Sequence, residues 1–309
     1  MITGVSRSAL TDAYIAELGQ AIDDNMESMT EIIKDATQKI TGYHSSQWSW
    51  CELTNTSVPG GVQWSCPTTT DSGVPPNQVL IALYNPSLVT HRVVSLPIHD
   101  SLYDVSVFEP IDGHSVAKAF VPAKAGVLCD YFNPHNSSAC KLYVNYTVHG
   151  QHIGYLMLSR NTSRQGLLVQ YQLKGASLIS MPHGSLELLS IDPEDGAIFE
   201  LTKKLYIGSF KFAFDLRYYL AYQGFEGSRA GASVFRPVSK DSLRYSNLTK
   251  VFVQRSDIVS QITLVYQDSD NETAVVKARM TFDSPLIEWD VNMETIPVTD
   301  QGKELIVSF

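Results

Sequence analysis

The chain has 309 residues, of which 44% are hydrophobic and 18% are charged, and its formal net charge is −9 at pH 7. This length and composition are typical of two or three globular domains, each able to bury a hydrophobic core. The acidic balance repels phosphate groups, so nucleic acids and anionic membrane surfaces are poor candidates for partners. No run of apolar residues is long enough to span a membrane.

The first segment, residues 1–42, is predicted to contain a long amphipathic helix over residues 8–41. Apolar side chains recur there at spacings of three and four residues, with Ser8 as a helix-capping residue and Gly42 as a stop signal. A single helix cannot bury such an apolar stripe alone, so we expect it to be the end of a helical bundle.

The four cysteines predict two local disulfides, Cys51–Cys66 and Cys129–Cys140. Each pair is close in sequence and encloses turn-forming residues, whereas the CxxC spacing typical of a zinc site does not occur. The alternative is free buried thiols. The first pair pins a predicted linker, residues 43–75, which is rich in Ser, Thr, Pro and Gly. Its tryptophans are expected to pack on a neighbouring element, with an exposed sugar-stacking surface as the alternative.

Six Asn-X-Ser/Thr sequons are candidate N-glycosylation sites: Asn55, Asn136, Asn145, Asn161, Asn247 and Asn271. Together with the predicted disulfides they indicate the secretory pathway, and hence a lysosomal or secreted protein. Residues 1–7 do not resemble a signal peptide. We therefore expect Met1 to be an internal start or an artificial edge of the sequence, with further sequence before it.

From residue 76 the apolar pattern changes to a period of two, which predicts β-strands. Short strands at regular spacing predict a small antiparallel β-sandwich over residues 76–160 and the first part of a larger one, galactose-mutarotase-like, over 161–309. Residues 192–196 (Asp-Pro-Glu-Asp-Gly) predict a hairpin turn. The His149-Gly150 step is interpreted as another hairpin tip. The fold class is therefore mainly β, with one long N-terminal helix.

No residue pattern predicts a complete catalytic or metal-binding site. Residues 231–235 (Gly-Ala-Ser-Val-Phe) form only half of a nucleophile-elbow motif and lack its strand-to-helix context. His149 and His152 are the only close histidine pair and would need a third ligand to hold zinc. The carboxylates of Asp23 and Asp24, and those of the turn at residues 192–195, are interpreted as solvated. No catalytic or metal-binding residue is assigned.

Short motifs in a fixed order nevertheless resemble a known family. They are Ile2–Ser6, Leu83–Pro86, Val93–Ile98, Phe120–Ala123, Leu186–Gly196, Ala230–Pro237, Ile296–Val298 and Gly302–Ile306. The chain resembles glycoside hydrolase family 38, the class II α-mannosidases, and within it the lysosomal-type branch. The resemblance extends over essentially the whole chain.

The resemblance implies a zinc-dependent, retaining enzyme that hydrolyses α-mannosyl linkages of N-glycans. It also implies that the catalytic domain, which supplies the nucleophile and zinc ligands, and the end of the large sandwich lie outside this sequence. Both would be partners of the chain, as would mannosyl glycans, and zinc would be a cofactor of the full-length enzyme only. At Ser233 the family has an aromatic residue near the bound sugar, whereas Arg236 is expected to be structural. The alternative function is a non-catalytic secreted β-sandwich module that binds glycans or a protein.

Overall fold

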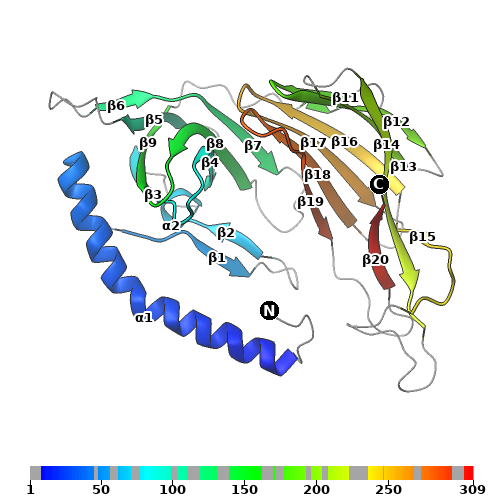
Figure 1. Cartoon of the computed structure of the whole chain (residues 1–309), viewed down its shortest axis with the longest axis horizontal. Coiled ribbons are helices and arrows are strands. Elements are labelled where there is room, and N and C mark those ends of the chain that lie inside the picture. Colours follow the sequence, from blue (N-terminus) through cyan, green and yellow to red (C-terminus); the bar gives the residue numbers. More distant parts are fainter. Residues whose placement is uncertain are drawn as a thin grey trace. The chain divides into compact units, whose positions relative to one another are not determined.

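The computed structural model (Figure 1) describes residues 8–44, 48–55, 62–70, 77–98, 103–109, 119–130, 139–161, 170–171, 177–192, 196–203, 208–222, 236–245, 247–267, 273–293 and 303–308. The fold class is mainly β with antiparallel sheets, as the alternating pattern predicts. The chain divides into two compact units. One combines Met1–Trp48, Tyr219–Asp241 and Val298–Glu304, and the other contains the remaining residues.

The first unit contains helix α1 (Ser8–Thr41), 34 residues long. It ends where Gly42, with φ of 71°, donates its amide to the Gln38 carbonyl at 2.9 Å, as glycine commonly does beyond the last helical turn. Ion pairs such as Lys39–Asp35 occupy its polar side, and Ile32 is exposed. Elsewhere in this unit, an isolated β-bridge joins Ala221 to Pro237.

A second helix, α2 (Pro67–Thr70), shows that the prediction of a single helix is wrong in this detail. Proline is well suited to a first helical position because the amide hydrogen that it lacks would have no partner there. The predicted linker also contains a hairpin of strands β1 (Glu52–Asn55) and β2 (Val62–Ser65). The Cys51–Cys66 disulfide closes the base of that hairpin.

The small sandwich consists of two sheets with the strand orders β3-β9-β5-β6 and β4-β8-β7. Its strands are β3 (Gln78–Tyr84), β4 (His91–Ile98), β5 (Tyr103–Glu109), β6 (Ala119–Pro122), β7 (Ala125–Asp130), β8 (Ala139–Val148) and β9 (Ile153–Arg160). Leu142, Val144, Leu156 and Leu158 lie at the centre of its core. The prediction of a hairpin tip at His149-Gly150 is wrong, because β8 and β9 belong to different sheets and the turn crosses from one to the other.

The large sandwich also has two sheets, β10-β16-β17-β18-β19 and β11-β12-β13-β14-β15, and β20 pairs with β14. Its strands are β10 (Gln170–Tyr171), β11 (Ser177–Met181), β12 (Gly184–Asp192), β13 (Gly196–Lys203), β14 (Ser209–Leu220), β15 (Leu243–Arg244), β16 (Asn247–Arg255), β17 (Val259–Gln267), β18 (Thr273–Thr281), β19 (Glu288–Met293) and β20 (Lys303–Ser308). Asp192 pairs with Gly196, so the predicted hairpin is confirmed.

An aromatic cluster fills part of the large-sandwich core. The ring of Phe214 stacks on Trp289 with centroids 4.6 Å apart, and Phe199 meets the same indole edge-on at 5.6 Å. Phe214 lies on β14 and Trp289 on β19, so the contact joins the two sheets. Apart from the last two residues of β14 and the first two of β20, both sandwiches fall within the second compact unit, and the domain boundary expected at residue 160 remains a prediction.

Candidate functional site

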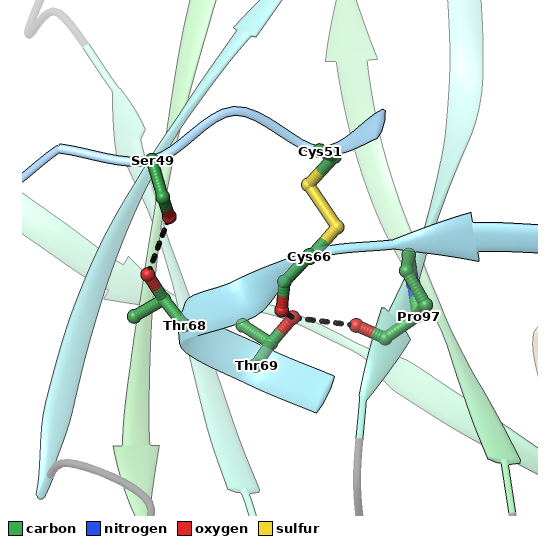
Figure 2. Close-up of a disulfide and its surroundings, with 6 residues drawn as sticks. All are labelled: Ser49, Cys51, Cys66, Thr68, Thr69 and Pro97. Atoms are coloured by element: carbon green, nitrogen blue, oxygen red, sulfur yellow. Dashed lines mark hydrogen bonds between the residues drawn. A yellow bond between two sulfur atoms is a disulfide. The ribbon is translucent and has the colours of Figure 1, made fainter. Parts of the chain in front are cut away.

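Both predicted disulfides, Cys51–Cys66 and Cys129–Cys140, are present. Figure 2 shows the surroundings of the first. The Ser49 and Thr68 hydroxyls share a hydrogen bond of 2.6 Å, and Thr69 Oγ1 donates to the Pro97 carbonyl at 2.8 Å. Thr69 therefore fastens the disulfide-closed hairpin to strand β4 of the small sandwich.

Three of the predicted glycosylation sites have described side chains. Asn145 and Asn247 are exposed. Asn161 is half-buried and its Nδ2 donates to Asp104 Oδ2 at 2.7 Å. Ser233, Asn136, Asn271 and the side chain of Asn55 lie outside the described residues.

Within the described part of the chain, no further metal ligand accompanies the histidine pair. The rings of His149 and His152 have centroids 6.0 Å apart, and His152 Nδ1 lies 2.6 Å from the Gly150 carbonyl oxygen. Among the described residues, no group of three His, Cys, Asp or Glu side chains could hold a metal ion. The residues present there therefore do not fit zinc.

The most elaborate arrangement of side chains in the described structure is the contact between the two sandwiches, which we call the junction. Apolar residues from both sides form its centre: Val93, Leu128 and Tyr143 from the small sandwich, and Ile258, Val259 and Phe282 from the large one. On the large sandwich the contact covers the outer face of the sheet that contains β16–β19. Side chains on this outer face are therefore buried, although they do not belong to the main core of the large sandwich.

Gln254 on β16 joins the sandwiches at the junction through both ends of its side-chain amide. Its Nε2 donates to the Cys129 carbonyl at 2.8 Å, and its Oε1 accepts from the Cys129 amide at 3.1 Å. The side chain thereby occupies the backbone groups that β7 directs away from β8, as a neighbouring strand would. Because Gln254 is only 4% exposed, this pair of hydrogen bonds is shielded from water.

A row of polar side chains continues from Gln254 across the same face. Arg279 donates through Nη1 to Glu288 Oε2 at 3.1 Å and through Nε to Gln261 Oε1 at 3.2 Å. Gln261 Nε2 in turn donates to Thr263 Oγ1 at 3.1 Å. Cross-strand register explains the row, since Gln254, Gln261, Arg279 and Glu288 are successive partners on β16 to β19.

Lys141 of the small sandwich lies beside this row of polar side chains. Its Nζ and the Arg279 guanidinium carbon lie 5.8 and 5.7 Å from the centroid of the Tyr143 ring, within cation–π range. Burial, and then the positive charge of Arg279, hold the pKa of Lys141 below its ordinary value, while Glu288 and Asp290 oppose the shift. The junction therefore contains a lysine whose charge is disfavoured by folding.

The junction also depends on one glycine. A Cβ on Gly126 would lie 2.1 Å from Ser256 Oγ, so the two sandwiches approach too closely there for a side chain. Ser256 is itself fixed, since its hydroxyl donates to the Val259 carbonyl at 2.8 Å and accepts from the Val259 amide at 3.0 Å. A larger residue at 126 would force one sandwich away from the other.

A separate ionic cluster surrounds Asp215 on β14. Its buried carboxylate lies 3.2 Å from Arg217 Nη1 and 3.4 Å from Arg244 Nε, and Arg217 Nε also donates to Ser242 Oγ at 2.7 Å. Burial, and secondarily the charge of Asp215, raise the pKa of the Tyr266 hydroxyl above its usual range. The two guanidiniums compensate the buried carboxylate, which is a structural role.

These arrangements can orient and stabilise the sandwiches, and none of them presents a nucleophile with a base. Sequence reasoning missed Gln254, Gln261 and Arg279, because polar residues that alternate along a strand are typical of a solvated face. Gly126 carried a usable signal, since an isolated glycine inside a strand suggests the close approach of another backbone or side chain.

Comparisons with known proteins add no relative. No protein-family model matches the chain, and no curated protein matches it. The two disulfides indicate an extracellular or secretory-pathway protein. No helix within the described ranges is both long and apolar enough to cross a membrane.

Proposed function

We propose that the chain is the β-sandwich scaffold of a class II, lysosomal-type α-mannosidase, a zinc-dependent retaining glycosidase of N-glycans. The observation that carries this proposal is the set of family-like motifs in the family's order. Support comes from their positions on regular elements. Leu83–Pro86 includes the end of β3, Val93–Ile98 lies on β4, and Leu186–Gly196 begins on β12 and ends at the first residue of β13.

The proposed role of this chain is to hold a catalytic domain rather than to carry out the reaction. Retaining glycosidases attack the sugar with one carboxylate and protonate the leaving group with another. We assign neither residue, nor a zinc ligand, to this chain, so these groups would come from sequence outside it. The polar junction supports a scaffold role, because directional hydrogen bonds fix how the two sandwiches are oriented.

Within the secretory pathway, we propose a lysosomal or secreted location for the protein, based on the sequons. The exposed side chains of Asn145 and Asn247 support glycan attachment at these positions. Treatment of the secreted chain with an endoglycosidase is expected to lower its apparent mass.

The enzymatic proposal is tested by comparing two proteins with an aryl α-mannoside in the presence of zinc. The chain alone is expected to give no turnover, whereas the chain extended by the coding sequence upstream of Met1 is expected to release the aryl group. Turnover by the chain alone would contradict the scaffold role. An extended protein that folds, binds zinc and remains inactive toward α-mannosides would contradict the assignment to this family.

A further inference from the structure

One end of the small sandwich presents apolar side chains to solvent. Two loops lie there, one joining β3 to β4 and the other joining β8 to β9. In the first loop Leu88 is 82% exposed and Val89 is 65% exposed, and Tyr84, at the end of β3, is 53% exposed. We call these three residues the apolar tip. A surface that shields two adjacent aliphatic side chains from water gains free energy.

Hydrogen bonds and close packing hold the two loops together. Asn85 is buried, and its Nδ2 donates to the Val89 carbonyl at 2.8 Å. Its own carbonyl accepts from the amide of Gln151, in the second loop, at 2.8 Å. A Cβ on Gly150 would lie 2.6 Å from the Leu88 carbonyl carbon, so the loops touch directly. The apolar tip is therefore fixed before a partner arrives, which lowers the entropic cost of binding.

The charge at this end differs from that of the whole chain. Residues 84–92 and 145–153 contain no Asp or Glu, although the chain has 32 acidic residues and a net charge of −9. Strand β5 ends on the same side with Glu109, and residues 110–118, which follow it, lie outside the described ranges. The exposed basic and histidine side chains described at this end are those of Arg92, Lys124, His149 and His152. The general repulsion of anionic surfaces by an acidic chain therefore does not apply here.

His149 and His152 make the charge of this end depend on pH, because histidine gains a proton between about pH 8 and pH 5. Their ring centroids lie 6.0 Å apart, and His152 Nδ1 lies 2.6 Å from the Gly150 carbonyl oxygen. Two protonated rings at this separation repel each other, whereas an anionic surface stabilises both charges. By linkage, binding to such a surface is expected to strengthen as the pH falls.

Exposed aliphatic side chains flanked by cations match a lipid surface, where apolar groups enter the acyl boundary and cations meet the headgroups. Tyrosine suits that boundary because its ring is apolar and its hydroxyl is polar. We propose that the apolar tip binds an anionic lipid bilayer reversibly, and more strongly in acid. The acidic remainder of the chain limits the contact to this end. The proposal goes beyond the scaffold role and does not depend on it.

Flotation of the full chain with vesicles of equal parts phosphatidylcholine and phosphatidylserine, at low ionic strength, tests this proposal. Binding is expected to be about threefold or more stronger at about pH 5 than at about pH 7.5. It should weaken as salt is added, because exposed charges are screened. Absence of flotation with these vesicles, or equal flotation with vesicles of phosphatidylcholine alone, would overturn the proposal.

A variant of the apolar tip gives the site-specific readout. Leu88→Ser combined with Val89→Ser is expected to weaken vesicle binding by about tenfold or more, because two apolar side chains no longer enter the lipid. Leu286→Ser combined with Val238→Ser is the matched control at positions 66% and 50% exposed, and it should float as the unmodified chain does. An equal loss in both double variants, or no loss in the first, would refute the assignment.

A second variant tests the histidine pair. His149→Gln combined with His152→Gln should remove most of the difference between the two pH values and leave binding at about pH 7.5 unchanged. His44→Gln, at another exposed position, should retain the difference. If the double variant also retains it in full, the histidine pair is not the source of the pH dependence.

Gel filtration of the same proteins separates lipid binding from self-association. A chain that forms a dimer, loses it in the Leu88/Val89 double variant and does not float with vesicles would overturn the lipid proposal in favour of an interface between copies. A monomer that floats supports it. Neither result bears on the mannosidase scaffold proposal, which is judged by turnover of the extended protein.

Discussion

The two faces of the sheet that contains β16–β19 are both buried, but at the outer face hydrogen-bonded polar side chains add to the apolar contact. The inner face presents apolar residues such as Leu264 and Val276 to the main core. The outer face presents Gln254 and Gln261, which are as well buried and are satisfied by hydrogen bonds. Apolar burial is non-directional. The hydrogen bonds of the outer face depend on distance and angle, so they determine how the two sandwiches are oriented, in addition to the apolar contact at the centre of the junction.

The inner face is expected to be the more sensitive to truncation. Leu264→Ala removes a side chain that is 0% exposed and should lower the free energy of unfolding by about 3–5 kcal/mol, because lost burial and a residual cavity add together. Urea denaturation measures the effect. Leu286→Ala, at a position 66% exposed, is the matched control and should change little. A loss below about 1 kcal/mol for Leu264→Ala would show that this face is not a packed core.

The outer face is expected to show an intermediate effect. Gln254→Ala leaves the Cys129 amide and carbonyl without their partner and should cost about 1–3 kcal/mol. Gln267→Ala, on an exposed residue at the end of β17, is the control of the same residue type. If both variants unfold at the same urea concentration as the unmodified chain, the hydrogen-bonded junction contributes no stability.

The smallest effect is expected at Lys141, and it should depend on pH. The folded-state pKa of Lys141 lies below its ordinary value of 10.5, so the unfolded chain binds more protons between the two values and stability rises with pH in that window. Lys141→Met removes the charge that folding disfavours. The variant should therefore melt at a higher temperature than the parent at pH 7, and the difference should shrink as pH approaches 10.5.

Thermal melts from pH 7 to 10.5 measure this difference, with Lys240→Met at an exposed position as the control. A lower melting temperature for Lys141→Met at pH 7 would mean that the ring of Tyr143 and the carboxylates of Glu288 and Asp290 outweigh burial. A difference that does not change with pH would show that the charge of Lys141 is not its cause.

The sequence predicted features that depend on neighbouring residues and missed features that depend on residues far apart in the chain. The period-two pattern from residue 76 predicted β-strands, and the residues around Asp192 predicted a hairpin, because both signals are local. Spacing along the chain was enough to pair the cysteines. The change of sheet after His149 depends on which distant strands β8 and β9 join, and no local residue specifies that choice.

The junction could not be predicted from the sequence for a related reason. Gln254 lies far from Cys129 in sequence, and a glutamine on a strand has the same local pattern whether it meets water or another sandwich.

The central structural claim is that Gln254 joins the two sandwiches by hydrogen-bonding the backbone of Cys129. Native-state hydrogen exchange of the Cys129 amide tests it directly, since this amide is held by a side chain rather than by a strand. We expect slow exchange in the unmodified chain and much faster exchange in Gln254→Ala, with the neighbouring amides of β8 still protected. Rapid exchange of the Cys129 amide in the unmodified chain would contradict it.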